Sequence, residues 1–155
     1  MTDEEFMDEA VRIAVQNVRE GGGPFGAVIV KDGKIVARGV NRVTLSLDPT
    51  AHAEVQAIRA ACRALGTFSL EGSVLYTSCE PCPMCLSAVY WARIDRIFYA
   101  CTRDDAERAG FSDSLIYDEL RKDISERIVR EIRIEDSRFL DPFREWDNKS
   151  DRTDY

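Results

Sequence analysis

Four residues in two short segments have the types and spacing needed to bind a metal and to hydrolyse a bond. The chain's only histidine, His52, lies in TAHAEVQAI (50–58), and Glu54 follows it by two positions. Cys82 and Cys85 lie downstream in TSCEPCPMC (77–85). Such residues serve in disulfides, structural metal sites or catalytic metal sites, and the rest of the sequence must decide between these uses.

The cysteine count argues against a disulfide framework. The chain has five cysteines, an odd number, and its N-terminus, MTDEEFMDEA, is acidic rather than basic and then apolar as in an export signal. Disulfides are rare in proteins that are not exported. Cys62 and Cys101 lie among apolar neighbours, and we expect them to be small core residues.

A zinc site explains the other residues better. His52 is predicted to open a helix that runs from about 51 to 65, and Cys82 and Cys85 to open the next helix. Cysteines at positions i and i+3 lie on nearly the same side of a helix, so both sulfurs can reach one ion. One imidazole and two thiolates suit zinc and leave a fourth tetrahedral position for water. Helix N-termini also favour thiolate over thiol.

Glu54 has a position that suits proton transfer. An offset of two residues from His52 is about 200° around a regular helix, so the two side chains can converge only at the helix end. There the carboxylate can reach the water in the open coordination position without binding the metal. A carboxylate so placed acts first as a general base and then as a general acid.

Taken singly, each motif has a simpler interpretation. A CxxC pair also occurs in redox proteins and in rubredoxin-like half-sites, and Pro83-Met84 between the cysteines does not exclude a thioredoxin-like motif. A lone histidine is often structural, and Glu54 alone would be an exposed helix residue. The combination of HAE and PCPMC, each at a predicted helix start, favours a catalytic zinc site.

The sequence pattern predicts one α/β domain of 155 residues. A helix over 3–20 follows a cap at Thr2 or Asp3, with an apolar face of Met7, Val11, Ala14 and Val18, and with Phe6 and Ala10 beside that face. Asp32-Gly33 predicts a hairpin within 27–40. The remaining predicted elements are strands at 73–78, 96–101 and 126–134, a helix at 81–93, and short helices within 104–122. Strands that alternate with helices indicate a sheet covered by helices on both faces.

Composition and charge exclude two classes of protein. The chain is 45% hydrophobic and 32% charged, as is usual for soluble globular proteins. A net charge of −7 and a pI of about 4.8 argue against a nucleic-acid partner, which requires clustered basic residues. No apolar run approaches the ~20 residues that span a bilayer, so we expect no membrane association and a cytoplasmic location.

The motifs H-x-E (52–54) and P-C-x-x-C (81–85) form the signature of zinc-dependent nucleobase and nucleoside deaminases. Along most of its length the chain resembles the cytidine deaminase-like superfamily. It is most similar to the small bacterial guanine deaminases in GGPFGAVIVKDG, DPTAHAEV, LYTSCEPCPMCL, YWAR and AGF. The resemblance implies a three-layer α-β-α fold with a five-stranded mixed sheet. It also implies a homodimer in which the C-terminal segment (136–155) is exchanged between subunits.

The resemblance also implies residue roles. His52, Cys82 and Cys85 would bind one zinc ion per chain, and Glu54 would transfer protons. The implied substrate-binding residues are Asn41, Phe25, Ala53, Trp91, Asp113 and Tyr155. Simpler roles remain open for several of these, because Asn41 suits a turn cap, Asp113 suits a helix cap, and Phe25 and Trp91 suit a core. Glu80 is either a second proton carrier or an exposed turn residue.

The function that this resemblance implies is hydrolysis of guanine to xanthine and ammonia. Deaminases of other aminated heterocycles, such as ammeline or cytosine, have the same signature, as do tRNA adenosine deaminases, although the acidic pI argues against RNA binding. A zinc-stabilised binding module is the non-enzymatic alternative. Glu54 argues against it, since a structural site has no use for a non-ligating carboxylate near an open coordination position.

Overall fold

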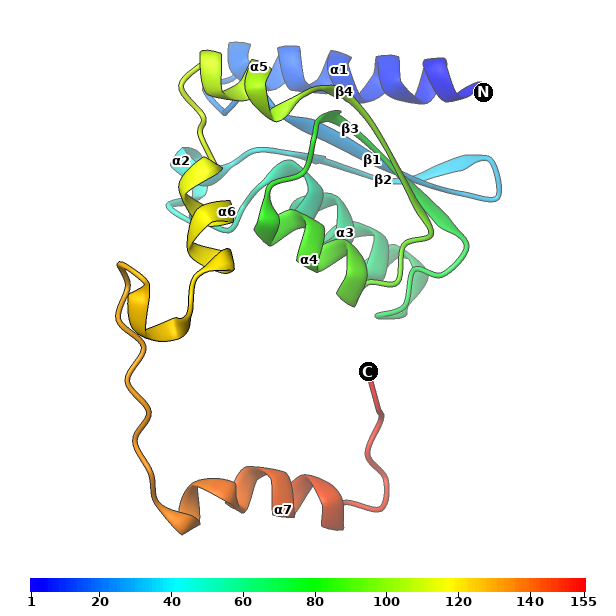
Figure 1. Cartoon of the computed structure of the whole chain (residues 1–155). Coiled ribbons are helices and arrows are strands. Elements are labelled where there is room, and N and C mark those ends of the chain that lie inside the picture. The colour runs from blue at the N-terminus through cyan, green and yellow to red at the C-terminus, as the bar shows by residue number, and fades with distance from the viewer. The chain divides into compact units, whose positions relative to one another are not determined.

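The computed structural model describes residues 1–155 and divides them into two compact units, Met1–Ile116 and Tyr117–Tyr155. All the strands lie in the first unit (Figure 1). The second unit consists of short helical segments and irregular backbone. Every helix of the chain falls short of the length and apolar character needed to cross a membrane.

The first unit alternates helices and strands in the predicted order. Its elements are α1 (Asp3–Arg19), β1 (Gly26–Lys31), β2 (Lys34–Val40), α2 (Val43–Ser46), α3 (Ala53–Leu65), β3 (Ser73–Cys79), α4 (Pro83–Trp91), β4 (Arg96–Cys101) and α5 (Arg103–Arg108). Helix α6 (Ser114–Arg121) crosses the boundary between the units. The second unit continues with η1 (Ile124–Glu126), η2 (Ser137–Leu140) and α7 (Asp141–Asn148). The short helix α2 is the one element of the first unit that the sequence pattern did not predict.

The sheet is mixed and has four strands in the order β2-β1-β3-β4. Strand β1 pairs antiparallel with both β2 and β3, and β3 pairs parallel with β4. The prediction of a fifth strand at 126–134 is wrong, because these residues form the end of η1 and irregular backbone. Their alternating apolar pattern suits a strand, but Ile128, Val129 and Ile132 are 67%, 78% and 81% exposed. A strand needs a neighbour to pair its backbone groups, and the chain provides none there.

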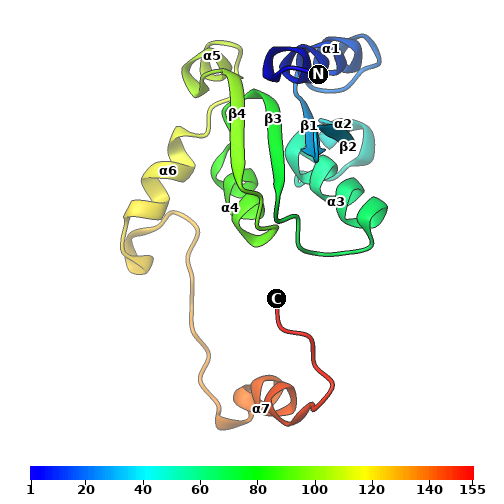
Figure 2. The ribbon, with the colours of Figure 1, turned by 90° about the vertical axis from the view of Figure 1, so that its right-hand side faces the viewer.

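Helices cover both faces of the sheet, so the first unit has three layers (Figure 2). Helix α1 lies on one face, where Phe6 packs with Val28 and Val30. Helices α3 and α4 lie on the other face, where Ala27 and Ile29 join the apolar core. Alternate residues of β1 therefore point into two separate cores, as the period of a strand requires.

Helix α1 begins with the predicted cap and buries part of the predicted apolar surface, namely Phe6, Ala10 and Ala14. Thr2 and Glu5 form a capping box at its start. The buried residues of the helix are Phe6, Ala10, Ile13, Ala14 and Asn17. Val11 and Val18, which the sequence pattern placed on the buried face, are 39% and 51% exposed. The apolar residues of α1 form two overlapping stripes along the helix. The stripe that contains Asn17 packs on the sheet.

Two helix N-termini meet near the ends of β2 and β3. Helix α4 follows β3 after a three-residue turn, 80–82. The first turn of α3 is held against β2 at Gly39, where an added Cβ would lie 2.1 Å from the carbonyl oxygen of Ala53. Only glycine allows this close approach. The backbone thus brings the segments that contain His52 and Cys82 to one place.

Candidate active site

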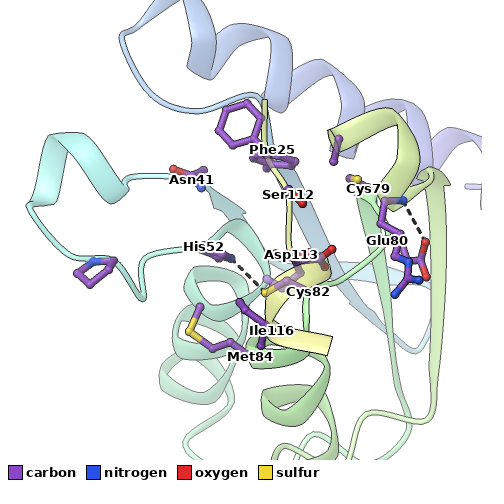
Figure 3. A pocket seen from close by; sticks show the side chains of 15 residues that line it. Phe25, Asn41, His52, Cys79, Glu80, Cys82, Met84, Ser112, Asp113 and Ile116 are labelled. Carbon is purple, nitrogen blue, oxygen red and sulfur yellow. Dashed lines mark hydrogen bonds between the residues drawn. The ribbon is translucent and has the colours of Figure 1, made fainter. Parts of the chain in front are cut away.

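His52, Cys82 and Cys85 converge as the sequence predicts. The Nδ1 atom of His52 lies 3.5 Å from the Sγ atoms of both cysteines. The three ligand atoms all lie within 4.8 Å of one another. Figure 3 shows the imidazole pointing at Cys82 across the base of a pocket. Segments that are thirty residues apart in the chain therefore present their donor atoms to one point.

This donor set fits zinc. Zinc bonds of about 2.3 Å to sulfur and about 2.0 Å to nitrogen, at a tetrahedral angle, place the sulfur and nitrogen atoms about 3.5 Å apart. The observed separations of 3.5 Å match that value. One imidazole and two thiolates are also the ligand types that zinc prefers, and three protein ligands are typical of catalytic rather than structural zinc.

The local backbone explains how each ligand is aimed. His52 and Cys82 are the N-cap residues of α3 and α4, with extended φ/ψ of −70°/156° and −66°/168°. Neither side chain caps its own helix, so both are available to a ligand. Pro83 and Ala53 begin the two helices, and Cys85 follows one turn into α4. Because His52 precedes the first helical residue, the offset between His52 and Glu54 does not follow regular helical geometry.

The charges of the ligand set are coupled through hydrogen bonds. A bond from Cys85, supported by one from His52, lowers the pKa of the Cys82 thiol well below its ordinary value. The bond to Cys82 and burial raise the pKa of Cys85. The pKa of His52 is raised, chiefly by its hydrogen bond with Cys82. The site thus favours a thiolate on Cys82, the form that binds metals.

Glu54 is a buried carboxyl group beside these ligands. It is 6% exposed, and its Oε1 lies 3.0 Å from the hydroxyl of Thr77 on β3. Burial raises the pKa of Glu54, which is the change that suits a group meant to both accept and donate a proton near neutral pH. The Thr77 hydroxyl also lies 3.0 Å from the carbonyl oxygen of Cys79, and its single proton can serve only one of these acceptors at a time.

A pocket of about 360 Å³ opens above the ligands, within the size range of small-molecule sites. His52, Glu54 and Cys82 lie in its wall. Its other lining residues include Phe25, Asn41, Glu80, Met84, Phe111 and Asp113. Burial raises the pKa of Asp113. The wall therefore combines apolar surface with a few polar groups.

Three of the substrate-binding residues that the resemblance implies reach this pocket. Phe25 packs edge to face on Phe111, with ring centroids 5.0 Å apart. The Oδ1 atom of Asn41 accepts the backbone N–H of Val43 at 3.2 Å, so Asn41 both caps a turn and lines the pocket. Asp113 lines the pocket immediately before α6.

Two of the other implied residues, Trp91 and Ala53, do not line the pocket, and the third, Tyr155, lies in the second unit. Trp91 is 70% exposed at the end of α4, where nine residues of helix separate it from Cys82 by roughly 13 Å. Ala53 is fully buried in the apolar core that α3 shares with the sheet. Tyr155 belongs to the second unit, where its ring lies edge-on to Trp146 with centroids 6.4 Å apart.

The sequence reasoning missed several neighbours of the site. Phe111 and Thr77 lie in AGF and LYTSCEPC, two segments that resemble the guanine deaminases, but the resemblance gave neither residue a role. Glu80 accepts the backbone N–H of Arg103 at 3.1 Å and so joins the turn before α4 to the start of α5 (Figure 3). Arg103 follows β4 and is 23 residues from Glu80 in the sequence, so no local pattern could indicate this contact.

Comparisons with known proteins agree with this geometry. Residues 1–101 match the family model of the cytidine and deoxycytidylate deaminase zinc-binding region. Guanine deaminase of Bacillus subtilis (strain 168) is 53% identical over 156 residues, which cover 100% of both chains. The X-ray structure of guanine deaminase from Bacillus subtilis has a TM-score of 0.98 and 52% identity, and covers 100% of this chain and 99% of that one.

A second relative is similar over less of its length. The tRNA-specific adenosine deaminase of Bacillus subtilis (strain 168) is 43% identical over 97 residues, which are 63% of this chain and 60% of that protein. Both relatives are deaminases, and the family model spans most of the three-layer unit that holds His52, Cys82 and Cys85. The chain therefore belongs to the deaminase family defined by the cytidine and deoxycytidylate deaminase zinc-binding region.

Proposed function

We propose that this chain is a zinc-dependent guanine deaminase that hydrolyses guanine to xanthine and ammonia. The observation that carries the proposal is the full-length identity of 53% to a guanine deaminase, in a chain that brings three zinc-ligand side chains together beside a buried carboxyl group. The tRNA-specific relative, in contrast, matches only 63% of the chain.

Glu54 is the residue that moves protons in this reaction. Zinc held by His52, Cys82 and Cys85 would lower the pKa of a water molecule and so supply hydroxide near neutral pH. Glu54 would accept one proton of this water as the water oxygen bonds to C2 of guanine, and would deliver that proton to ring N3. Glu54 would then carry the remaining proton of the added oxygen to the 2-amino nitrogen. The bond from C2 to that nitrogen would break, a carbonyl would form at C2, and the amino group would leave as ammonia.

Three pocket residues would orient the base. The Asn41 amide oxygen already accepts the N–H of Val43, so its NH₂ group is the part that can donate to an acceptor on the ring. Asp113 offers the opposite chemistry, an acceptor for the donors at N1 and the 2-amino group. The Phe25 ring provides an apolar surface next to the base. These roles suit guanine, which has both acceptor and donor edges.

A panel of substrates tests the proposal. We expect the zinc-loaded protein to release ammonia from guanine faster than from adenine, cytosine or cytidine, because among these only guanine has a ring N–H donor next to its amino group to face Asp113. Ammeline, which has the same pair of donors, tests the alternative substrate. A chelator should stop release from every substrate. Ammonia measured from each compound, with and without chelator, gives the result. No release from guanine by the zinc-loaded protein would contradict the proposal.

We also propose that the chain is a homodimer that exchanges residues 136–155 between subunits. No residue of 117–155 is buried, and Phe139, Leu140 and Phe143 are 54% to 69% exposed. Side chains of this kind are expected to be covered by a second copy. Sedimentation at micromolar concentration should give twice the mass of one chain, and a chain that ends at residue 135 should dimerise less. A full-length monomer would contradict this proposal.

The remaining partner assignments follow from charge and cysteine state. A net charge of −7 supports a free base rather than a nucleic acid as the substrate. All five cysteines are free thiols, which supports a reducing, cytoplasmic location.

A further inference from the structure

Asn17 is a buried amide near the end of α1 and lies outside the pocket. The residue as a whole is 1% exposed. Its Nδ2 atom donates two hydrogen bonds of 2.8 Å, one to the carbonyl oxygen of Gly23 and one to that of Asn41. A single side chain therefore joins α1, the glycine-rich loop after it and the residue that follows β2.

The orientation of this amide is determined by its surroundings. Both close partners are carbonyl oxygens, so the nitrogen end must face them. The Oδ1 atom is buried and has no hydrogen-bond partner. An apolar residue at this position would leave the carbonyl oxygens of Gly23 and Asn41 without this donor. The role of the amide is therefore to join these two backbone segments to the helix.

What Asn17 holds is part of the pocket wall. The Asn41 backbone N–H donates to the carbonyl oxygen of Phe25 at 3.1 Å, and the Gly23 N–H donates to the carbonyl oxygen of Asn41 at 3.4 Å. Asn41 and Phe25 both line the pocket. Asn17 joins Asn41 directly to helix α1, and Phe25 is joined to it indirectly, because the Phe25 N–H donates to the Gly23 carbonyl oxygen at 2.9 Å.

The glycine-rich loop packs closely against the side-chain amides of Asn17 and Asn41. A Cβ added to Gly22 would lie 2.4 Å from Nδ2 of Asn17. A Cβ added to Gly23 would lie 2.9 Å from Cγ of Asn41. The loop therefore packs directly on the side chains of Asn17 and Asn41. A methyl group at Gly23 would displace the Asn41 amide.

We propose that Asn17 is a positioning residue that sets where the Asn41 amide stands in the pocket and thereby sets the affinity for the substrate. The inference rests on the proposed function, since it takes Asn41 to be the group that meets the base. Asn17 itself touches neither substrate nor metal ligands, and it acts through two backbone carbonyl groups.

The kinetic test is a double-mutant cycle between Asn17→Ala and Asn41→Ala. We expect Asn17→Ala to raise KM for guanine about five- to tenfold, the effect of about one hydrogen bond, and to change kcat less than about twofold. In the Asn41→Ala background the same change should add less than about twofold, because the residue through which it acts is gone. Equal effects in both backgrounds would overturn the proposal.

Two further variants separate positioning from stability. Gly23→Ala should raise KM in the same direction, since it pushes on the Asn41 side chain. Phe6→Leu weakens the buried stripe of the same helix without touching the loop. It should lower the melting temperature but leave KM unchanged. A rise in KM in Phe6→Leu equal to that in Asn17→Ala would show that loss of stability explains the effect, and would also overturn the proposal.

A measurement without substrate keeps the inference separate from the proposed function. The Asn41 side-chain NH₂ resonance, identified by its loss in Asn41→Ala, should shift or broaden in Asn17→Ala and stay unchanged in Phe6→Leu. An unchanged resonance in Asn17→Ala overturns the positioning role whatever the substrate is. A shifted resonance in a protein that does not deaminate guanine supports the positioning role and rejects the proposed function.

Discussion

Replacing Glu54 by glutamine is expected to lower kcat for guanine by about 10³-fold or more, with zinc content unchanged. The carboxyl group is the only one buried beside His52, Cys82 and Cys85, and it is not needed as a ligand. Glutamine has the same shape but can neither take a proton from water nor deliver one to the ring. Steady-state ammonia release and metal analysis of the purified variant measure the two effects.

The variant should also fold normally, which makes the result interpretable. Glutamine retains an oxygen that can accept a hydrogen bond from the Thr77 hydroxyl, which lies 3.0 Å from Oε1 of Glu54 in the native protein. A neutral amide is cheaper to bury than a carboxylate, so the melting temperature of Glu54→Gln should equal or exceed that of the wild type. A variant with wild-type activity would show that Glu54 does not transfer protons in this enzyme.

Thr77 offers a weaker form of the same experiment. Thr77→Val removes the hydroxyl that orients Glu54 and keeps the shape of the side chain, so kcat should fall about tenfold, the value of one hydrogen bond to a charged group. Thr77→Ser keeps the hydroxyl and should retain most of the activity. Loss of activity in Thr77→Ser with retention in Thr77→Val would mean that packing of the methyl group, rather than the hydrogen bond, is what matters.

Local chemical signals explain why much of the fold and the metal centre could be predicted from the sequence. Thr2 caps α1, Asp32-Gly33 turns the hairpin, and the strands at 73–79 and 96–101 follow their apolar runs. The ligands His52 and Cys82 each precede a helix, a position that neighbouring residues specify. Ligand type and spacing therefore identified the site before any tertiary contact was known.

The features that could not be predicted depend on distant partners. The 126–134 segment has the alternation of a strand but no neighbouring strand to pair with. Asn17 interrupts an apolar stripe, which hides its role, because the carbonyl groups it binds belong to residues 6 and 24 positions later.

Removing the metal is expected to abolish ammonia release and one added equivalent of zinc to restore it. The two apolar clusters of the first unit do not include the three ligands, so the metal-free chain should keep its helical circular dichroism. Its melting temperature should fall, because an ion that binds only the native state stabilises that state. Full activity in a sample without metal would reject the metal-dependent mechanism.

Cysteine variants locate the metal within the chain. Cys85→Ser should lose zinc and activity together, since Cys85 is fully buried beside His52 and a hydroxyl is a much weaker zinc ligand than a thiolate. Cys62→Ser and Cys101→Ser are the matched controls, because these residues lie outside the ligand group and should retain about one zinc per chain. Zinc loss in Cys101→Ser with retention in Cys85→Ser would place the metal elsewhere.

Zinc affinity should also weaken as the pH falls, since the thiols and His52 must lose their protons to bind the metal.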